Sequence, residues 1–363
     1  MTSQLSKCKL EMSPLHLFDK IFNMAVFVLG AGATRGASFV MPTKNPCLPP
    51  LDADFYPQLQ RIQNRKHKDT IETVIRDTVE LFGVNFNVTM ETVFTTLEHT
   101  ERMIQTTGEN RDFKRSEINA KKEHLKQAIA ATLEEALCAG GQHEGTECEY
   151  HRKLVEAMKE TEEVISFNYD CLVDETLRRS GAGKWNARYG YGFNLGKRGS
   201  NLSGDESWMP KTPATKERTI KLYKLHGSLH FDAGGTKIKL KQRPYTKQFG
   251  QLRFTIIPPE SNKRYDQGVF KRLWYQAGQA LHRASTLVVI GYSFPLSDSH
   301  ATALFRVSTK EVGLKSLVLV NPDRDARRRA REVLKRGLSS KTKVLVFDTF
   351  KEFAAVDRDL WNA

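Results

Sequence analysis

The hydrophobic pattern of the chain consists of short apolar runs separated by longer stretches with helical periodicity. Short runs rich in β-branched residues are typical of strands buried on both faces. They are Ala25–Leu29, Glu163–Phe167, Lys221–Leu225, Thr286–Ile290, Ser316–Val320 and Val344–Phe347. Helical patterns separate many of them, at Asp170–Arg179, Lys271–His282 and Arg324–Leu334. This alternation predicts an α/β fold with a mostly parallel sheet and helices on both faces.

Residues 39–160 have a different pattern. A proline-rich loop, Pro42–Pro57, precedes long helical stretches with little strand signal, at Asp69–Phe82, Thr89–Thr106 and Ser116–Ala139. We therefore expect a helical insertion subdomain at 39–160, between the first and second strands, and an α/β domain formed by 1–38 and 161–363. The insertion would be a lid, an oligomer surface or both. Asn194–Arg218, rich in Gly, Ser, Pro and Lys, predicts a mobile surface loop.

Composition narrows the class of protein. Hydrophobic residues make up 39% and charged residues 27%, as in folded globular domains. The apolar run Met24–Leu29 is too short to span a bilayer, and no secretory signal pattern precedes it, so we expect a cytoplasmic protein. The 5 cysteines include no Cys-x-x-Cys pair, which disfavours a disulfide framework or a four-cysteine zinc module. We interpret Cys171 as a packed thiol.

The formal net charge of +14 allows attraction to a polyanion. Much of this charge lies in residues 324–336, which predict either a solvated helix face or a contact surface. Direct nucleic-acid contact through this basic helix is not favoured, because it lacks the interleaved aromatic residues of a stacking platform. Salt-dependent binding to DNA would revive that interpretation.

The turn after the first apolar run reads Gly-Ala-Gly-Ala-Thr-Arg-Gly and has the composition of a phosphate-binding turn. Glycine lets the backbone approach a phosphate closely, and N–H groups at a helix start bind the anion. Thr34 adds a hydroxyl donor and Arg35 a charge. We therefore expect a nucleotide to contact Gly30, Ala31, Gly32, Ala33, Thr34 and Arg35.

The spacing of this turn disfavours a hydride-transferring dehydrogenase. Gly30, Gly32 and Gly36 are spaced one residue wider than the dehydrogenase fingerprint, which also needs a second strand ending in an acidic residue. Here the corresponding acidic stretch, Pro49–Asp54, follows prolines instead of a strand. A tight structural turn without a ligand is the alternative for the glycines.

Polar residues follow two later strands. Asn168 lies where a ligand binds in open α/β sheets, and its amide offers a donor and an acceptor. Asp170 is expected to cap the next helix, and we also place it among the cofactor-binding residues. His226 is suited to general-base chemistry near neutral pH. A metal site at His226 and His230 would need helix geometry, which Gly227 opposes, so no metal is expected.

Two more strand ends carry small polar groups. Gly291 and Ser293 follow the fourth strand and Asn321 follows the fifth, a set that suits a ribose and its phosphates. Asp298 and Asp323, in the same loops, are equally well explained as helix caps.

Together these residues resemble a sirtuin-type NAD-binding domain. Gly30–Thr34 resembles the glycine-rich NAD loop of that family, with Thr34 where a serine is usual. Ser166–Asp170 resembles its Asn-bearing motif, and His226-Gly227 resembles its catalytic histidine motif. Gly291–Ser293 and Asn321 resemble its late ribose and adenine contacts. The resemblance extends from Ala25 to Phe347 and implies a Rossmann-like fold with NAD as the substrate.

The resemblance also suggests a branch of the family. Protein-deacylating sirtuins carry a zinc module with paired cysteines, which this sequence lacks. Pro49–Tyr56 and Met90–Phe94 resemble bacterial sirtuin-like proteins of anti-phage defence. That branch implies NAD hydrolysis, in which NAD depletion stops phage growth by abortive infection. Its members act as homo-oligomers or with partners that include hexameric DNA-translocating ATPases. We therefore expect a homo-oligomer, with such an ATPase as a further partner.

The leading hypothesis is an NAD+ glycohydrolase that releases nicotinamide and ADP-ribose, linear or cyclised. Positioning and charge stabilisation would dominate its oxocarbenium-like transition state. Asn168 would orient the nicotinamide-side ribose or the attacking water, and His226 would take a proton. The alternatives are an NAD-dependent protein deacylase and a non-catalytic NAD or ADP-ribose sensor in a defence complex.

Overall fold

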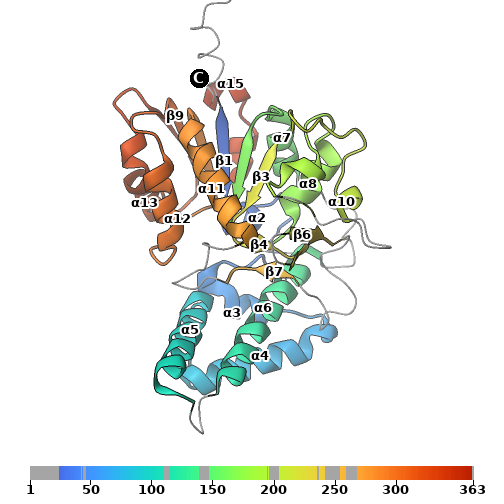
Figure 1. Cartoon of the computed structure of the whole chain (residues 1–363), viewed down its shortest axis with the longest axis vertical. Helices are drawn as coiled ribbons and strands as arrows, with labels where there is room; N and C mark the ends of the chain where they lie inside the picture. The colour runs from blue at the N-terminus through green and yellow to red at the C-terminus, as the bar shows by residue number, and fades with distance from the viewer. Residues whose placement is uncertain are drawn as a thin grey trace, which may run out of the picture.

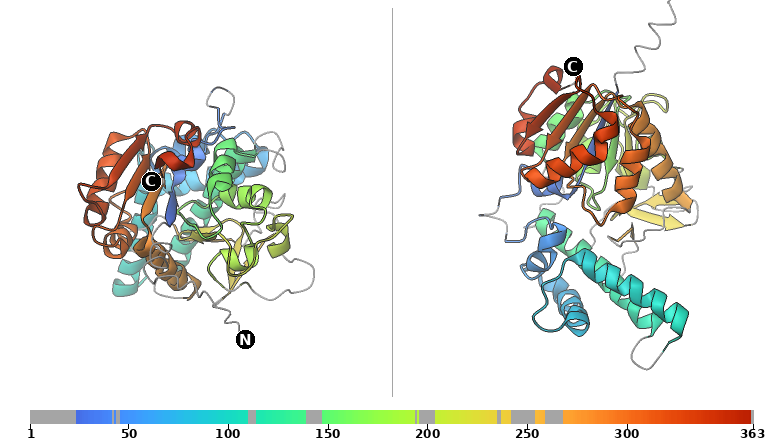
Figure 2. Two further views of the ribbon diagram at one scale, coloured as in Figure 1. Left: turned by 90° about the horizontal axis from the view of Figure 1, so that it is seen from above. Right: turned by 90° about the vertical axis from the view of Figure 1, so that its left-hand side faces the viewer.

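A computed structural model describes residues 24–41, 43, 46–109, 114–138, 147–193, 195, 204–234, 237–241, 254–258 and 268–361. The chain forms an α/β domain and a helical insertion that lies below it in Figure 1; Figure 2 shows the same two parts from above and from the side.

The α/β domain is built on a six-stranded sheet with the order β10-β9-β8-β1-β2-β3, and every neighbouring pair is parallel. Numbered along the chain, this is the 3-2-1-4-5-6 order of a Rossmann fold. The strands are β1 (Ala25–Leu29), β2 (Glu163–Ser166), β3 (Lys221–Lys224), β8 (Thr286–Ile290), β9 (Ser316–Val320) and β10 (Lys343–Phe347). All six predicted strands are confirmed, and the fold is the expected Rossmann-like one.

Burial explains why these segments are strands. Every residue of β1, β8 and β9 is buried, as expected of central parallel strands covered on both faces. The edge strand β10 instead alternates between half-buried and exposed residues. The chain leaves β1 toward β2 and β3, and later returns to β8 on the other side of β1. This reversal is the topological switch point, where ligands bind in such sheets.

Two groups of helices cover the sheet. Contacts link α7, α8 and α14 in one group and α11, α12 and α13 in the other, as right-handed crossovers on opposite faces require. Three of them confirm the predicted helices, with bounds that shift at α8 and α11. The bounds are α7 (Glu149–Ala157), α8 (Leu172–Ser180), α11 (Gly268–Arg283), α12 (Ser299–Ser308), α13 (Arg324–Leu334), α14 (Phe350–Ala354) and α15 (Arg358–Trp361).

The insertion follows β1 and has a hydrophobic cluster of its own. Residues between Phe55 and Leu133 supply most of this cluster, and Leu229 and Ile256 from the α/β domain join it. Its helices are α3 (Phe55–Leu59), α4 (Lys68–Phe82), α5 (Met90–Thr107) and α6 (Arg115–Cys138). Helix α7 lies within the predicted insertion range 39–160, yet its Leu154 and Val155 pack into the sheet core. The division of the chain at residue 160 stays a prediction.

Short elements fill the region between β3 and β8. They are β4 (Gly227–Ser228) paired with β7 (Thr255–Ile256), and β5 (Phe231–Gly234) paired with β6 (Lys237–Leu240). The predicted loop 194–218 contains α10 (Gly204–Ser207), while residues 194 and 196–203 lie outside the described residues, as do Pro42 and Cys8. Two further short helices are α2 (Ala31–Arg35) and α9 (Ala187–Gly190). No helix in the described part of the chain has the length and apolarity needed to cross a membrane.

Candidate active site at the carboxyl ends of the strands

Asn168 is the centre of a hydrogen-bond network between the ends of β1 and β2. Its side-chain amide donates to the carbonyl oxygen of Gly30 and to the Thr34 hydroxyl, both at 3.0 Å. The residue is only 8% exposed. Its Oδ1 atom is buried and has no hydrogen-bond partner within the described residues. Since a buried acceptor is rarely left unsatisfied, this oxygen is available to a donor that the chain does not supply.

Asp170 completes this network. Its Oδ2 atom accepts a hydrogen bond from the Thr34 hydroxyl at 2.8 Å, and its Oδ1 accepts one from the backbone N–H of Leu172 at 2.9 Å. The expected N-cap role is corrected in detail, because Cys171 is the N-cap residue of α8 and Asp170 precedes it. The Thr34 hydroxyl gives its proton to Asp170, so it does not point at a phosphate as expected. Thr34 instead locks Asn168 and Asp170 together.

The glycine turn packs directly against the loop after β8. The N–H groups of Gly30 and Gly32 donate to the carbonyls of Ile290 and Gly291, at 3.0 and 2.9 Å. A Cβ on Gly30 would lie 2.5 Å from the Cα of Tyr292, and one on Gly32 would lie 2.8 Å from the Cα of Gly291. These glycines are therefore required by the close approach of two loops. Both N–H groups are already hydrogen-bonded within the protein. Their expected contact with a phosphate stays a prediction.

Arg35 points toward the insertion. Its guanidinium donates to Asp54 and to the carbonyl of Pro49, both at 2.6 Å. The short helix α2, which contains Ala31 and Ala33 of the predicted turn, therefore connects to the insertion through its last residue. A contact between Arg35 and a phosphate stays a prediction.

His226 follows β3 and lies against an aromatic pair. Its ring meets Phe167 edge-on, with centroids 5.1 Å apart, and Phe167 stacks on Tyr292 at 4.2 Å. The Nε2 atom of His226 lies 3.4 Å from Oδ2 of Asp298. Phe167 is the residue before Asn168, so one short segment contacts His226 and carries the amide network. The structure thus places both predicted catalytic residues at adjacent strand ends.

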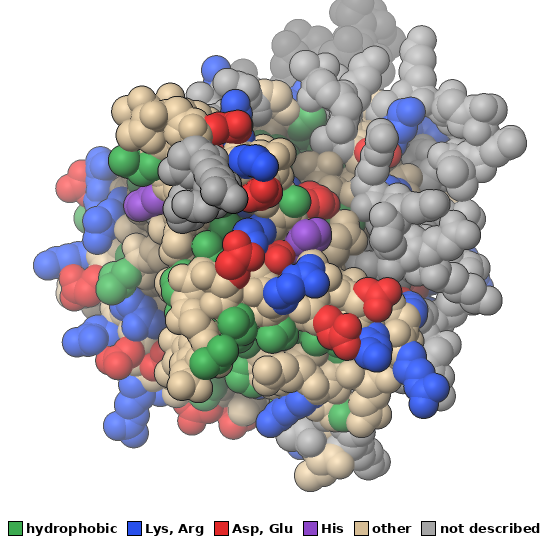
Figure 3. Space-filling view, turned by 90° about the horizontal axis from the view of Figure 1, so that it is seen from below, with side chains coloured by type: hydrophobic (Ala, Val, Ile, Leu, Met, Phe, Trp, Pro, Cys, Tyr) green, Lys and Arg blue, Asp and Glu red, His purple; other side chains and the backbone are tan. Residues whose placement is uncertain are grey.

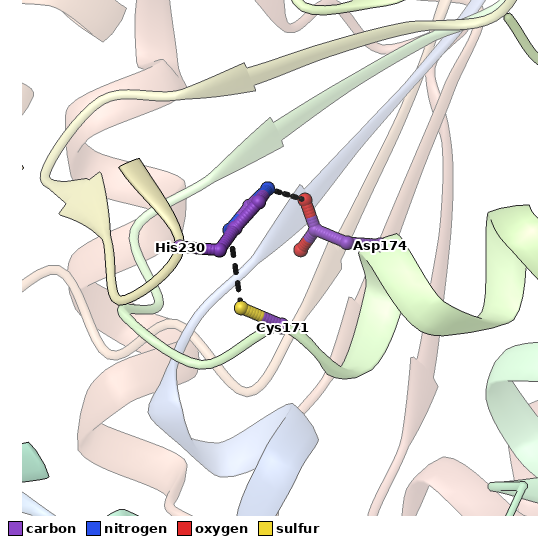
Figure 4. A group of neighbouring side chains, drawn as sticks. All are labelled: Cys171, Asp174 and His230. Carbon is purple, nitrogen blue, oxygen red and sulfur yellow. Dashed lines mark hydrogen bonds and ion pairs between the residues drawn. The ribbon is translucent and has the colours of Figure 1, made fainter. Parts of the chain in front are cut away.

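The sequence indicated that His226 and His230 do not lie on a helix, and the structure agrees. Gly227, between them, has a φ of 78° and starts β4. His230 instead belongs to a separate buried cluster with Cys171 and Asp174, shown in Figure 4. Its Nδ1 lies 3.1 Å from the Cys171 sulfur, and its Nε2 lies 3.5 Å from Asp174.

This cluster has the ligand types of a metal site, but a lysine already neutralises it. Lys224 donates to Asp174 at 2.8 Å, and both side chains are fully buried. Burial opposes ionisation of the carboxyl, but the Lys224 charge holds the pKa of Asp174 below its ordinary value. Burial raises the pKa of the Cys171 thiol and lowers the pKa of His230 to about 3. The cluster is therefore a buried ion pair with a neutral thiol and imidazole, and Cys171 is the packed thiol expected.

Some polar groups after β8 and β9 form hydrogen bonds within the protein. The carbonyl of Ser293 accepts a hydrogen bond from Arg329 at 3.0 Å, and the side-chain oxygen of Asn321 accepts one from the N–H of Asp323 at 3.0 Å. No described hydrogen bond joins Ser293 or Asn321 to the Asn168 network. Asp298 and Asp323 are the N-caps of α12 and α13, which confirms the cap interpretation of both.

The basic helix α13 is partly neutralised by acidic neighbours. Arg327 pairs with Asp348, Arg328 with Asp325 and Arg329 with Asp323. These pairs fit a solvated helix face. The contact-surface interpretation stays a prediction.

Two features of the site region were not found in the sequence. Asp298 was interpreted as a strand-end polar group or a helix cap, and its contact with His226 was not predicted because the two residues are far apart in the sequence. Cys148 lies 3.1 Å from Nδ1 of His151 and accepts from the N–H of Ser38, just after the glycine turn. Burial opposes ionisation, yet the charge and hydrogen bonds of His151 lower the pKa of Cys148 to about 6. The Cys-x-x-His spacing was the available signal.

Comparison with known proteins agrees with this geometry. A search of curated proteins finds no match. The family model described as SIR2-like domain matches residues 162–340, a range that holds Asn168, Asp170, His226, Gly291 and Asn321. SIR2-like domains use NAD as a substrate, so the match indicates an NAD-dependent enzyme. Residues 162–340 are thus similar to a SIR2-like domain, and with the Rossmann sheet and the polar strand ends this is consistent with a sirtuin-like protein.

Proposed function

We propose that the protein is an NAD+ glycohydrolase, which cleaves NAD+ to nicotinamide and ADP-ribose. The reaction adds water across the bond between nicotinamide and C1′ of its ribose. The electron pair of the broken bond goes to the nicotinamide nitrogen, the water oxygen bonds to C1′, and one proton is released. Such a reaction depends mainly on positioning and on charge stabilisation.

The observation that supports this proposal most is the buried Oδ1 atom of Asn168. The two donors of the amide are fixed on Gly30 and Thr34, so the acceptor has a fixed direction. Within the described residues it has no partner. A water molecule or a ribose hydroxyl is the kind of donor that would satisfy it. The residues thus fit a substrate that brings a hydroxyl to the end of β2.

His226 supplies the second function. As a base, it would accept the proton of the attacking water or of a ribose hydroxyl. It is 7% exposed and fixed by Phe167, so its ring has a defined orientation.

Between the ends of β3 and β9 lie four strand spacings of about 4.8 Å, or roughly 19 Å. An extended dinucleotide crossing this edge would put its nicotinamide near Asn168 and its adenine near Asn321.

The biological role that we propose is abortive infection, in which the activated enzyme depletes cellular NAD. The sequence resemblance to anti-phage proteins supports this role. A homo-oligomer and a hexameric DNA-translocating ATPase are the partners proposed on the same grounds. The insertion is suited to transmit activation, because it contacts the active-site loops through Arg35 and Leu229.

The test is to incubate the purified protein with NAD+ and quantify nicotinamide. Asn168→Ala and His226→Ala should each lower release by about 10²-fold or more, a typical loss for an acid–base or positioning group. His282→Ala, an exposed histidine, is the matched control and should keep full activity. Circular dichroism of each variant excludes unfolding as the cause.

Other outcomes distinguish the alternatives. Turnover that needs an acetylated peptide would identify a deacylase. Tight NAD+ or ADP-ribose binding without turnover, also after addition of a candidate partner, would identify a sensor. Wild-type turnover in both variants would show that the catalytic assignment is wrong.

A further inference from the structure

Asp298 has a geometry that a helix cap alone does not explain. Its Oδ1 atom accepts a hydrogen bond from the N–H of Ala301, at 3.4 Å, and so caps α12. Its Oδ2 atom accepts from the Tyr292 hydroxyl at 3.0 Å and lies 3.4 Å from Nε2 of His226. The side chain of Asp298 is 5% exposed and that of His226 is 9% exposed. A desolvated carboxylate therefore faces one particular nitrogen of the predicted base.

The surroundings fix both members of this pair. Tyr292, which orients the carboxylate, stacks on Phe167, and Phe167 meets the edge of His226. The backbone carbonyl of His226 accepts from the N–H of Ile257 at 2.8 Å. These contacts form a closed ring of four side chains: Phe167, Tyr292, Asp298 and His226. The imidazole is held from two sides, by an aromatic edge and by a carboxylate.

We propose that Asp298 is a positioning residue for His226, which it holds through Nε2 so that Nδ1 is the nitrogen that accepts a proton. A carboxylate is an acceptor only, so it favours the tautomer in which Nε2 carries the hydrogen. The lone pair is then on Nδ1. Orienting the base in this way has the logic of the aspartate in a catalytic triad, in which the carboxylate sets the tautomer and does not take the proton.

The tautomer can be measured without any turnover. With 15N-labelled histidine, two-bond proton–nitrogen correlation spectra above pH 8 distinguish the two neutral forms of an imidazole. His226→Ala assigns the signals. We expect the Nε2–H form in the wild-type protein and a clear change of the ring nitrogen shifts in Asp298→Asn. Dominance of the Nδ1–H form would overturn the proposal.

The kinetic test uses two aspartates that both cap helices after sheet strands. Asn caps as well as Asp, so Asp298→Asn keeps the cap and removes the charge. We expect kcat for nicotinamide release to fall by about 10²-fold, with KM within about threefold. The same change at Asp323, which caps α13, should leave kcat unchanged. Wild-type kcat in Asp298→Asn would refute the proposal.

A second variant covers the case in which Asp298→Asn folds poorly. Tyr292→Phe keeps the stacking on Phe167 and removes the Tyr292 hydroxyl that donates to Oδ2. A loss of about tenfold or more in kcat is expected, as for one hydrogen bond to a charged acceptor. This kinetic part rests on the proposed NAD+ glycohydrolase activity. A wild type without turnover would therefore count against that activity, while the tautomer would still decide the role of Asp298.

Discussion

Individual residues of the site carry more than one task. Thr34 accepts a hydrogen bond from Asn168 and donates one to Asp170, while Gly30 supplies both a carbonyl for Asn168 and the space for Tyr292. The sequence indicated which polar residues lie at these strand ends. It could not show where a hydroxyl proton points or which carboxylate meets which imidazole, because those depend on packing between segments far apart in the chain.

Comparing alanine substitutions at two glycines with positive φ distinguishes the cost of backbone strain from the cost of a steric clash. Gly291 has a φ of 64° and Gly183 a φ of 71°. A Cβ on Gly291 would lie 2.1 Å from the backbone nitrogen of Ala33, whereas nothing lies within 4 Å of one on Gly183. Both changes to Ala carry a similar conformational penalty of about 1–2 kcal/mol. We expect Gly291→Ala to lower the melting temperature well beyond the few degrees lost in Gly183→Ala. Equal losses in thermal unfolding would contradict the close-packed loops.

His230 predicts a pH dependence of stability. Burial lowers its pKa in the folded protein to about 3, against about 6.5 in the unfolded chain. Below pH 6.5 the unfolded state therefore binds the extra proton, and stability falls by at most about 1.4 kcal/mol per pH unit toward pH 3. In His230→Gln the unfolded chain has no histidine at this position to bind the extra proton. Its stability deficit relative to wild type should shrink between pH 7 and pH 4.

Urea denaturation at a series of pH values measures this effect. The exposed His282 changed to Gln is the control, and its difference from wild type should stay constant. A constant gap for His230→Gln would show that His230 becomes protonated in the folded protein.

At the scale of elements, the hydrophobic pattern was a good guide where burial is complete. Strands such as β1 and β8 are buried throughout and were predicted with their observed bounds. Short elements were missed, among them β4 and β7, because two paired residues leave no periodic pattern. Residues 149–157 were assigned to the insertion without a predicted helix, whereas they form α7, whose Leu154 and Val155 pack into the sheet core.

The buried ion pair between β3 and α8 should be important for stability. Lys224 and Asp174 are fully buried, so removing one charge leaves the other without its partner. Lys224→Met should destabilise the protein by about 3–5 kcal/mol in urea denaturation. Breaking the exposed pair with Arg328→Ala should change stability by less than about 1 kcal/mol.

A double variant separates the pair from the packing of its members. Lys224→Met combined with Asp174→Asn should lose less stability than the two single changes added together. Strict additivity would mean that the two groups do not interact.

At the scale of the whole molecule, the insertion and the α/β domain meet at the candidate site. Ser297, the residue before Asp298, donates a hydrogen bond from its hydroxyl to Glu91 of the insertion at 2.5 Å. Arg35 of the glycine turn forms an ion pair with Asp54. Seen from the insertion end, basic and acidic side chains are interspersed (Figure 3), so that face does not segregate the net charge of +14 by sign. The hydrophobic pattern predicted the existence of the insertion, whereas these contacts with the site loops need the three-dimensional structure.

The ion pair between Arg35 and Asp54 should couple the two parts. Asp54 also accepts from the N–H of Leu51 and from the Gln58 amide, so it organises the start of the insertion. Asp54→Ala should speed hydrogen exchange in peptides covering both 51–60 and 29–40. Peptides from β9 and α13 serve as the internal control. Faster exchange confined to 51–60 would argue against coupling.

The place of the insertion between β1 and β2 has a consequence for biosynthesis. Every residue of β1 is buried in the finished sheet, yet its neighbours β2 and β8 are made only after the whole insertion. At about 5–20 residues per second, the ribosome needs on the order of 10 s to reach β2. The insertion helices rely largely on local contacts and can form in that interval. A nascent chain paused there would expose an unpaired apolar strand, which makes β1 the segment that we expect chaperones to protect first.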